Sequence, residues 1–239
     1  MGAPAVVWDE AKQEATVDSY VKAPDSDAPG SLFRPISLLD PDLVTSPPPW
    51  LGHTPFAFWI MDALRPARFV ELGTHSGNSY AAFCQAVRHL GLPTACDAVD
   101  TWMGDPQAGR YGEEVYQTFA AHHDARYRAF SRLLRMTFDE AASEFADGSI
   151  DLLHIDGLHT YEAVRHDFET WRPKMSRRGV VLFHDVAERR DDFGVWRLWE
   201  ELSAAHPSFT FLHSHGLGVL GLGDDLPEAV RALFAVHAG

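Results

Sequence analysis

From residue 50 onward, short apolar runs alternate with stretches in which apolar residues recur every three or four positions. Apolar runs of about four to eight residues predict buried strands, and the longer period predicts amphipathic helices. Strands are expected at residues 68–72, 96–99, 131–136, 150–155, 180–184, 209–213 and 218–222. Helices are expected at residues 56–64, 78–90, 161–175 and 198–205.

Strands that alternate with helices favour a parallel sheet covered on both faces and joined by right-handed crossovers. The last two expected strands are separated by only a few residues, so they must pair antiparallel. The sequence therefore predicts an α/β fold: a doubly wound, mostly parallel sheet of seven strands that ends in an antiparallel hairpin.

The first 50 residues have a different composition. Seven of the 15 prolines lie between Pro24 and Pro49. Proline fixes φ and lacks a backbone donor, so this stretch is expected to be extended. We expect residues 1–50 to be an N-terminal extension that lies over the domain or a neighbouring subunit, and residues 51–239 to form the domain. A partly disordered leader is the alternative.

Composition and charge narrow the function classes. The chain has 20 Lys and Arg against 34 Asp and Glu, a formal net charge of −14, which argues against binding a nucleic-acid backbone but not a small cationic ligand. The two cysteines, Cys84 and Cys96, are too few for a disulfide scaffold or a cysteine zinc site. The sequence shows neither a signal peptide nor an apolar stretch of ~20 residues, so we expect a soluble cytoplasmic protein.

The segment after the first expected strand reads ELGTHSGNS at residues 71–79. Gly73 and Gly77 permit a tight turn, and the helix that follows offers free N–H groups to an anion such as a carboxylate. The turn lacks the central glycine of G-x-G-x-x-G, so a pyrophosphate ligand is disfavoured. No G-K-[ST] follows, and His75 stands where a nucleophile elbow has serine, so a P-loop and a G-x-S-x-G hydrolase are excluded.

Candidate ligand-binding residues also follow the next two expected strands. Asp100 ends the second strand, where a carboxylate binds ribose hydroxyls in dinucleotide-binding folds. A surface aspartate at a strand end is the alternative reading. Phe138 follows the third strand and could cover a purine face, or it could belong to the core.

The fourth and fifth expected strands carry the densest chemistry. Asp156 follows one, and His184 with Asp185 ends the other, so two carboxylates and an imidazole converge as ligands for Mg²⁺ or Mn²⁺. His159 would lie beside the metal as a neutral base. Alternatively, Asp156 caps the following helix. Other neighbouring histidines are expected to be surface or structural residues: His122, His123, His213 and His215.

Taken together, the 69–77 segment, Asp100 and the Asp156…His184-Asp185 set resemble class I S-adenosylmethionine-dependent methyltransferases, which have a Rossmann-like fold. Residues 100–105, DTWMGD, and 155–161, IDGLHTY, look like a bacterial subgroup often found beside glycosyltransferases and in antibiotic pathways. The resemblance covers roughly residues 50–223.

The resemblance implies a role for each matching position. The residues expected to bind S-adenosylmethionine are Glu71, Gly73, Thr74, Gly77, Ser79, Asp100, Thr101, Thr137, Phe138 and Asp156. The glycine turn would surround the methionine part, Asp100 would hold the ribose hydroxyls, and Thr137 with Phe138 would contact adenine.

The resemblance also implies a divalent metal, Mg²⁺ or Mn²⁺, on Asp156, His184 and Asp185, with His159 as the catalytic base. Position 184 is usually an oxygen donor in this family, so the histidine here weakens the case for Mg²⁺ and opens Mn²⁺ or no metal. The segment from Trp102 to Gly112 looks like a lid, because it carries glycines, charges and aromatic residues after a strand.

These observations favour an O-methyltransferase that acts on a hydroxyl of a sugar or glycosylated small metabolite in natural-product biosynthesis. The acceptor would be selected by residues 102–116, by residues 187–195 and by the extension, and a proline-rich arm also suits a homo-oligomer. No nucleic-acid or membrane partner is expected. The alternatives are a nicotinamide-dependent oxidoreductase on a similar sheet and a non-catalytic ligand-binding protein that retains the fold.

Overall fold

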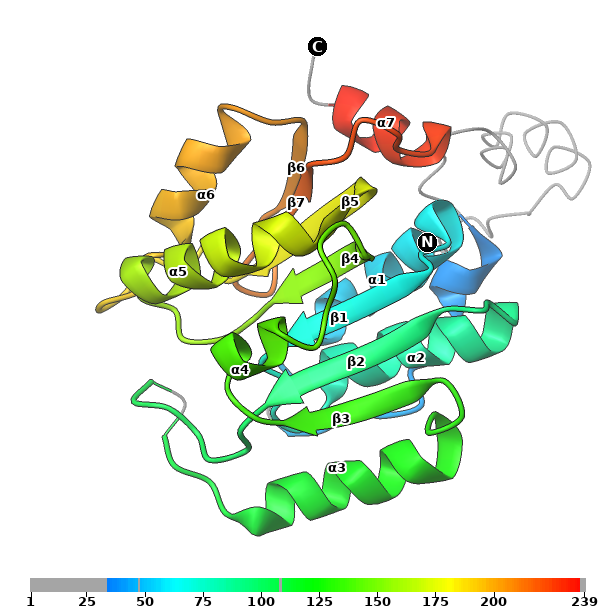
Figure 1. Ribbon diagram of the computed structural model, residues 1–239, viewed down its shortest axis with the longest axis vertical. Helices are drawn as coiled ribbons and strands as arrows, with labels where there is room; N and C mark the ends of the chain where they lie inside the picture. Colours follow the sequence, from blue (N-terminus) through cyan, green and yellow to red (C-terminus); the bar gives the residue numbers. More distant parts are fainter. Residues whose placement is uncertain (1–33, 47, 108, 237–239) are drawn as a thin grey trace, which may run out of the picture.

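A seven-stranded sheet forms the centre of the computed structural model, which describes residues 34–46, 48–107 and 109–236. The strand order is β3-β2-β1-β4-β5-β7-β6 (Figure 1). The strands are β1 (Arg68–Leu72), β2 (Ala95–Asp100), β3 (Ser131–Arg135), β4 (Ile150–Ile155), β5 (Met175–His184), β6 (Ser208–Phe211) and β7 (Leu217–Gly221). Strands β1 to β5 pair in parallel, whereas β7 is antiparallel to both β5 and β6. The predicted fold class is confirmed.

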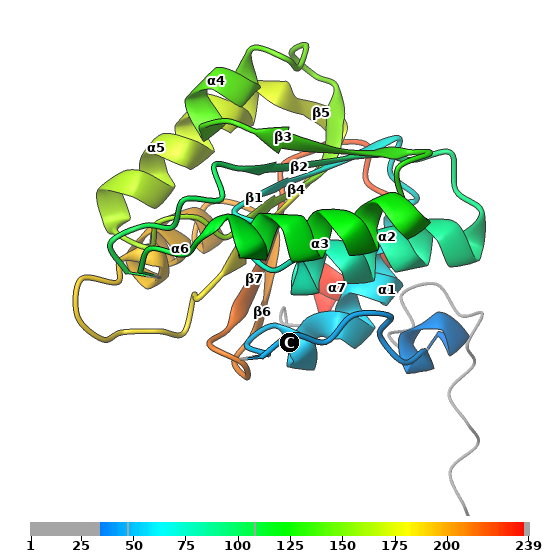
Figure 2. The ribbon, with the colours of Figure 1, turned by 90° about the horizontal axis from the view of Figure 1, so that it is seen from below.

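Helices cover both faces of the sheet (Figure 2). They are α1 (Thr54–Leu64), α2 (Asn78–Leu90), α3 (Glu113–Arg126), α4 (Phe138–Ala142), α5 (Tyr161–Trp171), α6 (Val195–Ser203) and α7 (Glu228–Ala235). One apolar core lies under α1, α2, α3 and α7, and a second lies under α4, α5 and α6. Neighbouring residues of β1 serve opposite cores, Phe69 the first and Val70 the second, because successive side chains of a strand point to opposite faces.

Two strands and one helix near the centre of the sheet have the predicted bounds. Strands β1 and β4 and helix α2 begin and end where the pattern predicts. All six residues of β4 are buried, since a central parallel strand is covered on both sides. Helix α2 lies between two glycines in the left-handed conformation, Gly77 before it and Gly91 after it, and the left-handed glycine ends the helix.

Other boundaries differ from the prediction. The helix expected at 161–175 ends at Trp171, because Pro173 follows and cannot continue it. Strand β5 therefore begins at Met175, five residues before the expected start. Helix α6 begins at Val195, three residues before the expected start at 198.

Three helices were not expected from the pattern. Helix α3 buries only Phe119 and His123, so it has no apolar stripe. It includes the last residues of the 102–116 segment that was expected to select the acceptor. Helix α4 has five residues, too short for a periodic signal. Helix α7 does bury Ala229, Val230 and Leu233 on one face, and the prediction omitted it.

Part of the proline-rich extension lies along α2. The N–H of Asp42 donates to Oε1 of Gln85 (2.7 Å), and the N–H of Thr45 donates to Oδ1 of Asn78 (2.9 Å). The hydroxyl of Thr45 also lies 2.8 Å from that of Ser76, in the glycine turn. Residues 1–33 and 47 of the expected extension lie outside the described residues.

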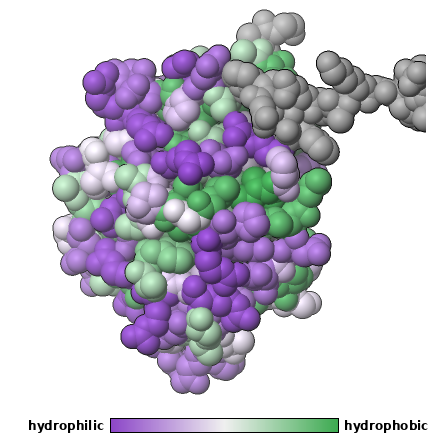
Figure 3. All heavy atoms as spheres, turned by 90° about the vertical axis from the view of Figure 1, so that its right-hand side faces the viewer, coloured by the Kyte–Doolittle hydropathy of each residue, from purple (hydrophilic) through white to green (hydrophobic). Residues whose placement is uncertain are grey.

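The face shown in Figure 3 is mainly polar, with one group of apolar side chains among the polar ones. Scattered apolar side chains are normal on a protein surface. Among the described residues, none of the helices has the length and apolar character needed to cross a membrane.

Candidate functional site

A cavity of about 640 Å³ opens at the carboxyl ends of β1, β2, β4 and β5. The chain runs outward from β1 through β2 to β3 and returns on the other side of β1 as β4, so the cavity lies at the topological switch point. Its volume falls within the ~300–1,000 Å³ typical of small-molecule sites. The predicted site residues that line it are Gly73, Thr74, Ser79, Asp100, Thr101, Thr137, Phe138, Asp156, His159, His184 and Asp185.

The glycine turn between β1 and α2 forms one wall. Gly73 has a φ of +88°, and a Cβ there would lie 2.1 Å from the carbonyl oxygen of Asp156. Gly77 has a φ of +83°, and a Cβ there would lie 2.0 Å from the ring of Phe119. Glycine at both positions lets the turn pack against the end of β4 and against α3. Gly77 faces α3 and does not line the cavity.

Asp100 ties the end of β2 to this turn. Its Oδ2 accepts hydrogen bonds from the N–H groups of Thr74 (2.9 Å) and His75 (2.8 Å), and its Oδ1 accepts one from the N–H of Trp102 (2.6 Å). His75 and Trp102 both have a positive φ, 48° and 52°. Such strained backbone persists only where its surroundings hold it, and here the Asp100 carboxylate does so.

Glu71 differs from its predicted place. Its side chain is fully buried, and Oε2 lies 2.8 Å from Nδ1 of His154 on β4. Burial raises the pKa of Glu71 above its ordinary value. Glu71 therefore does not line the cavity; it joins β1 to β4 through His154.

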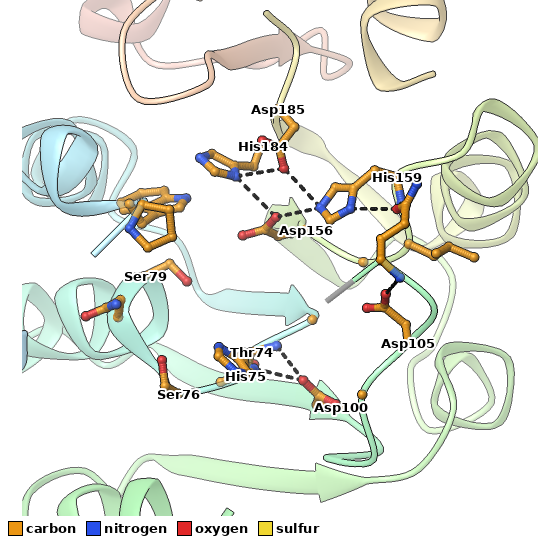
Figure 4. A pocket seen from close by; sticks show the side chains of 18 of the residues that line it. Thr74, His75, Ser76, Ser79, Asp100, Asp105, Asp156, His159, His184 and Asp185 are labelled. Atoms are coloured by element: carbon orange, nitrogen blue, oxygen red, sulfur yellow. Dashed lines mark hydrogen bonds and ion pairs between the residues drawn. The ribbon is translucent and has the colours of Figure 1, made fainter. Parts of the chain in front are cut away.

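Two aspartates and two histidines gather at the tips of β4 and β5 (Figure 4). Nδ1 of His184 lies 3.3 Å from Oδ1 of Asp156 and 3.2 Å from Oδ2 of Asp185. Nε2 of His159 lies 2.9 Å from Oδ2 of Asp185 and 3.8 Å from Oδ1 of Asp156. The side chain of Thr160 caps α5, so Asp156 does not serve as its cap.

This cluster changes the acidity of all four groups. Burial alone would lower the pKa of each histidine, but the neighbouring carboxylates raise the pKa of His159 to about 9 and that of His184 to about 10. Burial alone would raise the pKa of each aspartate, but the histidines lower that of Asp185 to about 2 and hold that of Asp156 well below its ordinary value. At neutral pH the four groups form two ion pairs.

Three of these residues also meet the geometric requirement for a metal site. Asp156, His184 and Asp185 each offer one ligand atom, and the three atoms lie within 4.8 Å of one another. They are the group of possible metal ligands found among the described residues. Two carboxylates with one imidazole suit a first-row transition ion such as Mn²⁺ better than Mg²⁺, which prefers oxygen ligands.

The third side of the cavity is formed by the start of α4. Thr137 is the N-cap of this helix, and its side chain and that of Glu140 form a capping box. Phe138 is half-buried and lines the cavity. A Cβ on Gly157 would lie 2.5 Å from its ring, so the ring packs directly on the segment that follows β4.

Several lining residues were not predicted individually. They are Trp50, His75, Gln107, Tyr111, Phe193 and His215. The segments expected to select the acceptor contain Gln107, Tyr111 and Phe193, and the end of the proline-rich stretch contains Trp50, so composition indicated their regions. His215 was expected to be a surface or structural residue; it lies at the cavity, and nothing in its local sequence indicates this.

A family model described as a methyltransferase domain matches residues 70–186, from β1 to the end of β5 and just beyond. The uncharacterized protein y4gI of Sinorhizobium fredii is 54% identical over 184 residues, which are 77% of this chain and 20% of that protein. A mimivirus protein is 26% identical over 128 residues, 51% of this chain and 52% of that one. The chain thus spans about a fifth of the first relative and half of the second.

Solved methyltransferases have a similar fold. The O-methyltransferase TomG of Streptomyces achromogenes, determined with S-adenosylmethionine, has a TM-score of 0.55 and 14% identity, and the match covers 77% of this chain and 83% of TomG. An O-methyltransferase of Bacillus cereus, determined with S-adenosylhomocysteine, has a TM-score of 0.54 and 13% identity, with 76% and 84% covered.

Residues 70–186 therefore form a methyltransferase domain built on the sheet order and switch-point cavity described above. This family match covers just under half of the chain, and the fold of the chain is similar to that of solved O-methyltransferases.

Proposed function

We propose that this protein transfers a methyl group from S-adenosylmethionine to a hydroxyl of a sugar or glycosylated small metabolite. The observation that carries the proposal is one cavity with Asp100 at one side and the cluster of Asp156, His159, His184 and Asp185 at the other. The first group suits a nucleoside, and the second suits deprotonation of a hydroxyl.

The cofactor is assigned to the glycine-turn side. Three N–H groups already bind the Asp100 carboxylate, which has about four acceptor positions, so one position remains for a ribose hydroxyl. The free N–H groups at the start of α2 suit the methionine carboxylate. Phe138 and Thr137 are assigned to adenine, and Gly73, Thr74 and Ser79 to the methionine part.

The acceptor hydroxyl is assigned to the space beside His159. Bound S-adenosylmethionine supplies a methyl group made electrophilic by the sulfonium. The hydroxyl oxygen forms the new bond to that methyl, the sulfur departs with the electron pair as a neutral thioether, and the hydroxyl proton passes to Nε2 of His159. The ring is stacked on Phe193, with centroids 4.7 Å apart and planes 5° apart, which fixes the direction of Nε2.

We assign a divalent cation to the group formed by Asp156, His184 and Asp185. When bound, such a cation supplies positive charge that favours the alkoxide form of a hydroxyl. The carboxylates of Asp156 and Asp185 are also the partners of Nε2 of His159, so the base and the cation would share one acidic surface.

The segments that surround the cavity are assigned to the domain, to the extension and to acceptor selection. We assign residues 51–239 to the domain and residues 1–50 to an extension whose described part supports the glycine turn through Thr45. Residues 102–112 and 187–195 are assigned to acceptor selection, since both supply lining residues. The two free, buried cysteines suit a reducing cytoplasm.

A nicotinamide-dependent oxidoreductase is not favoured. The glycine turn lacks the central glycine of the dinucleotide motif, and the matched family is a methyltransferase domain. A non-catalytic binding protein is also less well supported, because the chain retains the whole cluster at the tips of β4 and β5. We expect NADH to give no protection against thermal unfolding, whereas S-adenosylmethionine raises the Tm.

Calorimetric titration with S-adenosylmethionine tests the cofactor assignment. Asp100→Ala is expected to weaken binding by more than tenfold, about 1.4 kcal/mol, because both the ribose contact and the hydrogen bonds that hold the glycine turn are lost. Asp224→Ala, at an exposed position that pairs with Arg177 and does not line the cavity, is the control and should bind normally. Normal binding by Asp100→Ala would remove the nucleoside from this side of the cavity.

Titration with metal ions tests the cation assignment. The imidazole of His184 should make binding of Mn²⁺ at least tenfold tighter than that of Mg²⁺, and His184→Asp should reduce this preference by replacing nitrogen with oxygen. Asp185→Ala should abolish binding of both ions. If neither ion binds the unmodified protein in the presence or absence of S-adenosylmethionine, the cluster acts as ion pairs alone.

A further inference from the structure

The side chain of Gln107 reaches from the loop after β2 to His159, which lies after β4. Its Oε1 lies 2.8 Å from the backbone nitrogen of His159 and 2.9 Å from Nδ1 of the same residue. Two segments that are 52 positions apart in sequence therefore meet at one amide group. Neither the glycine turn nor the metal-ligand set includes this contact.

The contact decides which ring nitrogen of His159 carries a fixed proton. A backbone N–H can only donate, so the Gln107 atom that faces it must be the carbonyl oxygen. The same oxygen faces Nδ1, and an oxygen without a proton can only accept, so Nδ1 must be the donor. The ring therefore keeps its proton on Nδ1, and proton exchange takes place at Nε2.

The side-chain and backbone nitrogens of Gln107 also make hydrogen bonds. Its Nε2 donates to Oδ1 of Asp192 (2.6 Å), and its backbone N–H donates to Oδ1 of Asp105 (2.6 Å). The donation to Asp192 agrees with the assignment of Oε1 as the acceptor. On the far side, the N–H of Gly194 donates to the carbonyl of His159 (2.7 Å).

We propose that Gln107 is a positioning residue for methyl transfer: it holds His159 with Nδ1 protonated and Nε2 directed at Asp156 and Asp185. This inference rests on the proposed role of His159 as the base. Gln107 acts through His159 and exchanges no proton with the substrate. The side-chain amide of Gln107 thus sets both the tautomer and the orientation of His159. In other histidine sites, hydrogen-bond partners outside the reacting groups have the same effect.

Two variants separate positioning from simple packing. Gln107→Met keeps the length of the side chain and removes the acceptor. Gln107→Glu with Asp192→Asn keeps an acceptor for His159 and exchanges the amide and the carboxylate, so one hydrogen bond between the two positions is retained. Gln117→Met, on the exposed side of α3, is the matched control for a Gln→Met change.

Nuclear magnetic resonance of protein with ¹⁵N-labelled histidine reports the contact without any acceptor. The Nδ1–H signal of His159 is assigned by its absence in His159→Gln. We expect this signal in the unmodified protein, in Gln117→Met and in the exchanged pair. It should be lost in Gln107→Met. Hydrogen exchange at the backbone N–H of His159 should accelerate at least tenfold in Gln107→Met alone.

Turnover with a panel of methyl glycosides reports the consequence. Gln107→Met should lower kcat by about 10- to 100-fold with little change in the KM for S-adenosylmethionine, and the exchanged pair should recover most of that loss. An unchanged Nδ1–H signal or an unchanged kcat in Gln107→Met overturns the positioning role. If His159→Gln itself retains turnover, the base assignment fails instead, and the signal and exchange data still decide whether Gln107 orients the ring.

Discussion

Replacing His159 with glutamine is expected to lower methyl transfer by about 10²- to 10⁴-fold, the usual contribution of a general base. Glutamine keeps a polar side chain of similar reach but cannot take up the proton of the hydroxyl. Binding of S-adenosylmethionine should stay within about threefold, because the cofactor is assigned to the opposite side of the cavity, at Asp100 and the glycine turn. The measurements are initial rates with radiolabelled cofactor and calorimetry on the same samples.

The pH profile of the unmodified protein gives a second check on the same residue. Burial alone would lower the pKa of His159, but Asp156 and Asp185 raise it to about 9. A base must start unprotonated, so without a divalent cation the rate should rise with pH up to about 9. A cation on those carboxylates would weaken their hold on the proton, and the rise should then move to lower pH.

His166→Gln is the control, because this histidine lies on the exposed side of α5 beside Asp139, away from the cavity. It should leave the rate and its pH profile unchanged. Full turnover by His159→Gln would reject the base assignment and leave the family and the fold as they are.

Gly73→Ala should both destabilise the protein and reduce cofactor binding by more than tenfold. A φ of +88° costs an alanine about 1–2 kcal/mol, and its Cβ would lie 2.1 Å from the carbonyl oxygen of Asp156, which adds about 1–3 kcal/mol of overpacking. For a chain of this size the Tm should fall by roughly 10 °C. The contact is with backbone, so relief of the clash must move the end of β4 that carries Asp156.

Gly91→Ala separates the two causes. Gly91 also has a positive φ, +60°, but a Cβ there would meet nothing within 4 Å. This variant should lose only the conformational part, about 1–2 kcal/mol, and should bind S-adenosylmethionine normally. Equal losses of stability and of binding in the two variants would contradict the close contact between the glycine turn and β4. Differential scanning calorimetry and cofactor titration provide both comparisons.

Much of the sheet was predictable because its signal is local. Strands β1 and β4 were predicted with their observed bounds, and the order of strands and helices predicted the doubly wound fold. The same logic placed Gly73, Asp100, Asp156 and Asp185 at strand ends, where a parallel sheet brings side chains together. Helices α3 and α4 were not predicted, because the first has no apolar stripe and the second has five residues.

The chemistry of the site was less predictable. The sequence indicated His159 as a neutral base, but two carboxylates within 4 Å favour its protonated form, and only the folded chain brings them there. Glu71 matched a cofactor position in its motif, yet the pairing of β1 with β4 buries it against His154. The contact between Gln107 and His159 joins two loops, and loops carry no periodic signal.

By itself, then, the order of residues determined which elements form, the class of sheet and the residue types at each strand tip, because apolar period and glycine placement act over a few neighbouring positions. Tertiary structure alone decided which tips face one another, which of two neighbouring side chains enters the cavity, and where protons reside. Those outcomes depend on distances of a few ångströms between groups that lie tens of residues apart, and burial strengthens each interaction once they meet.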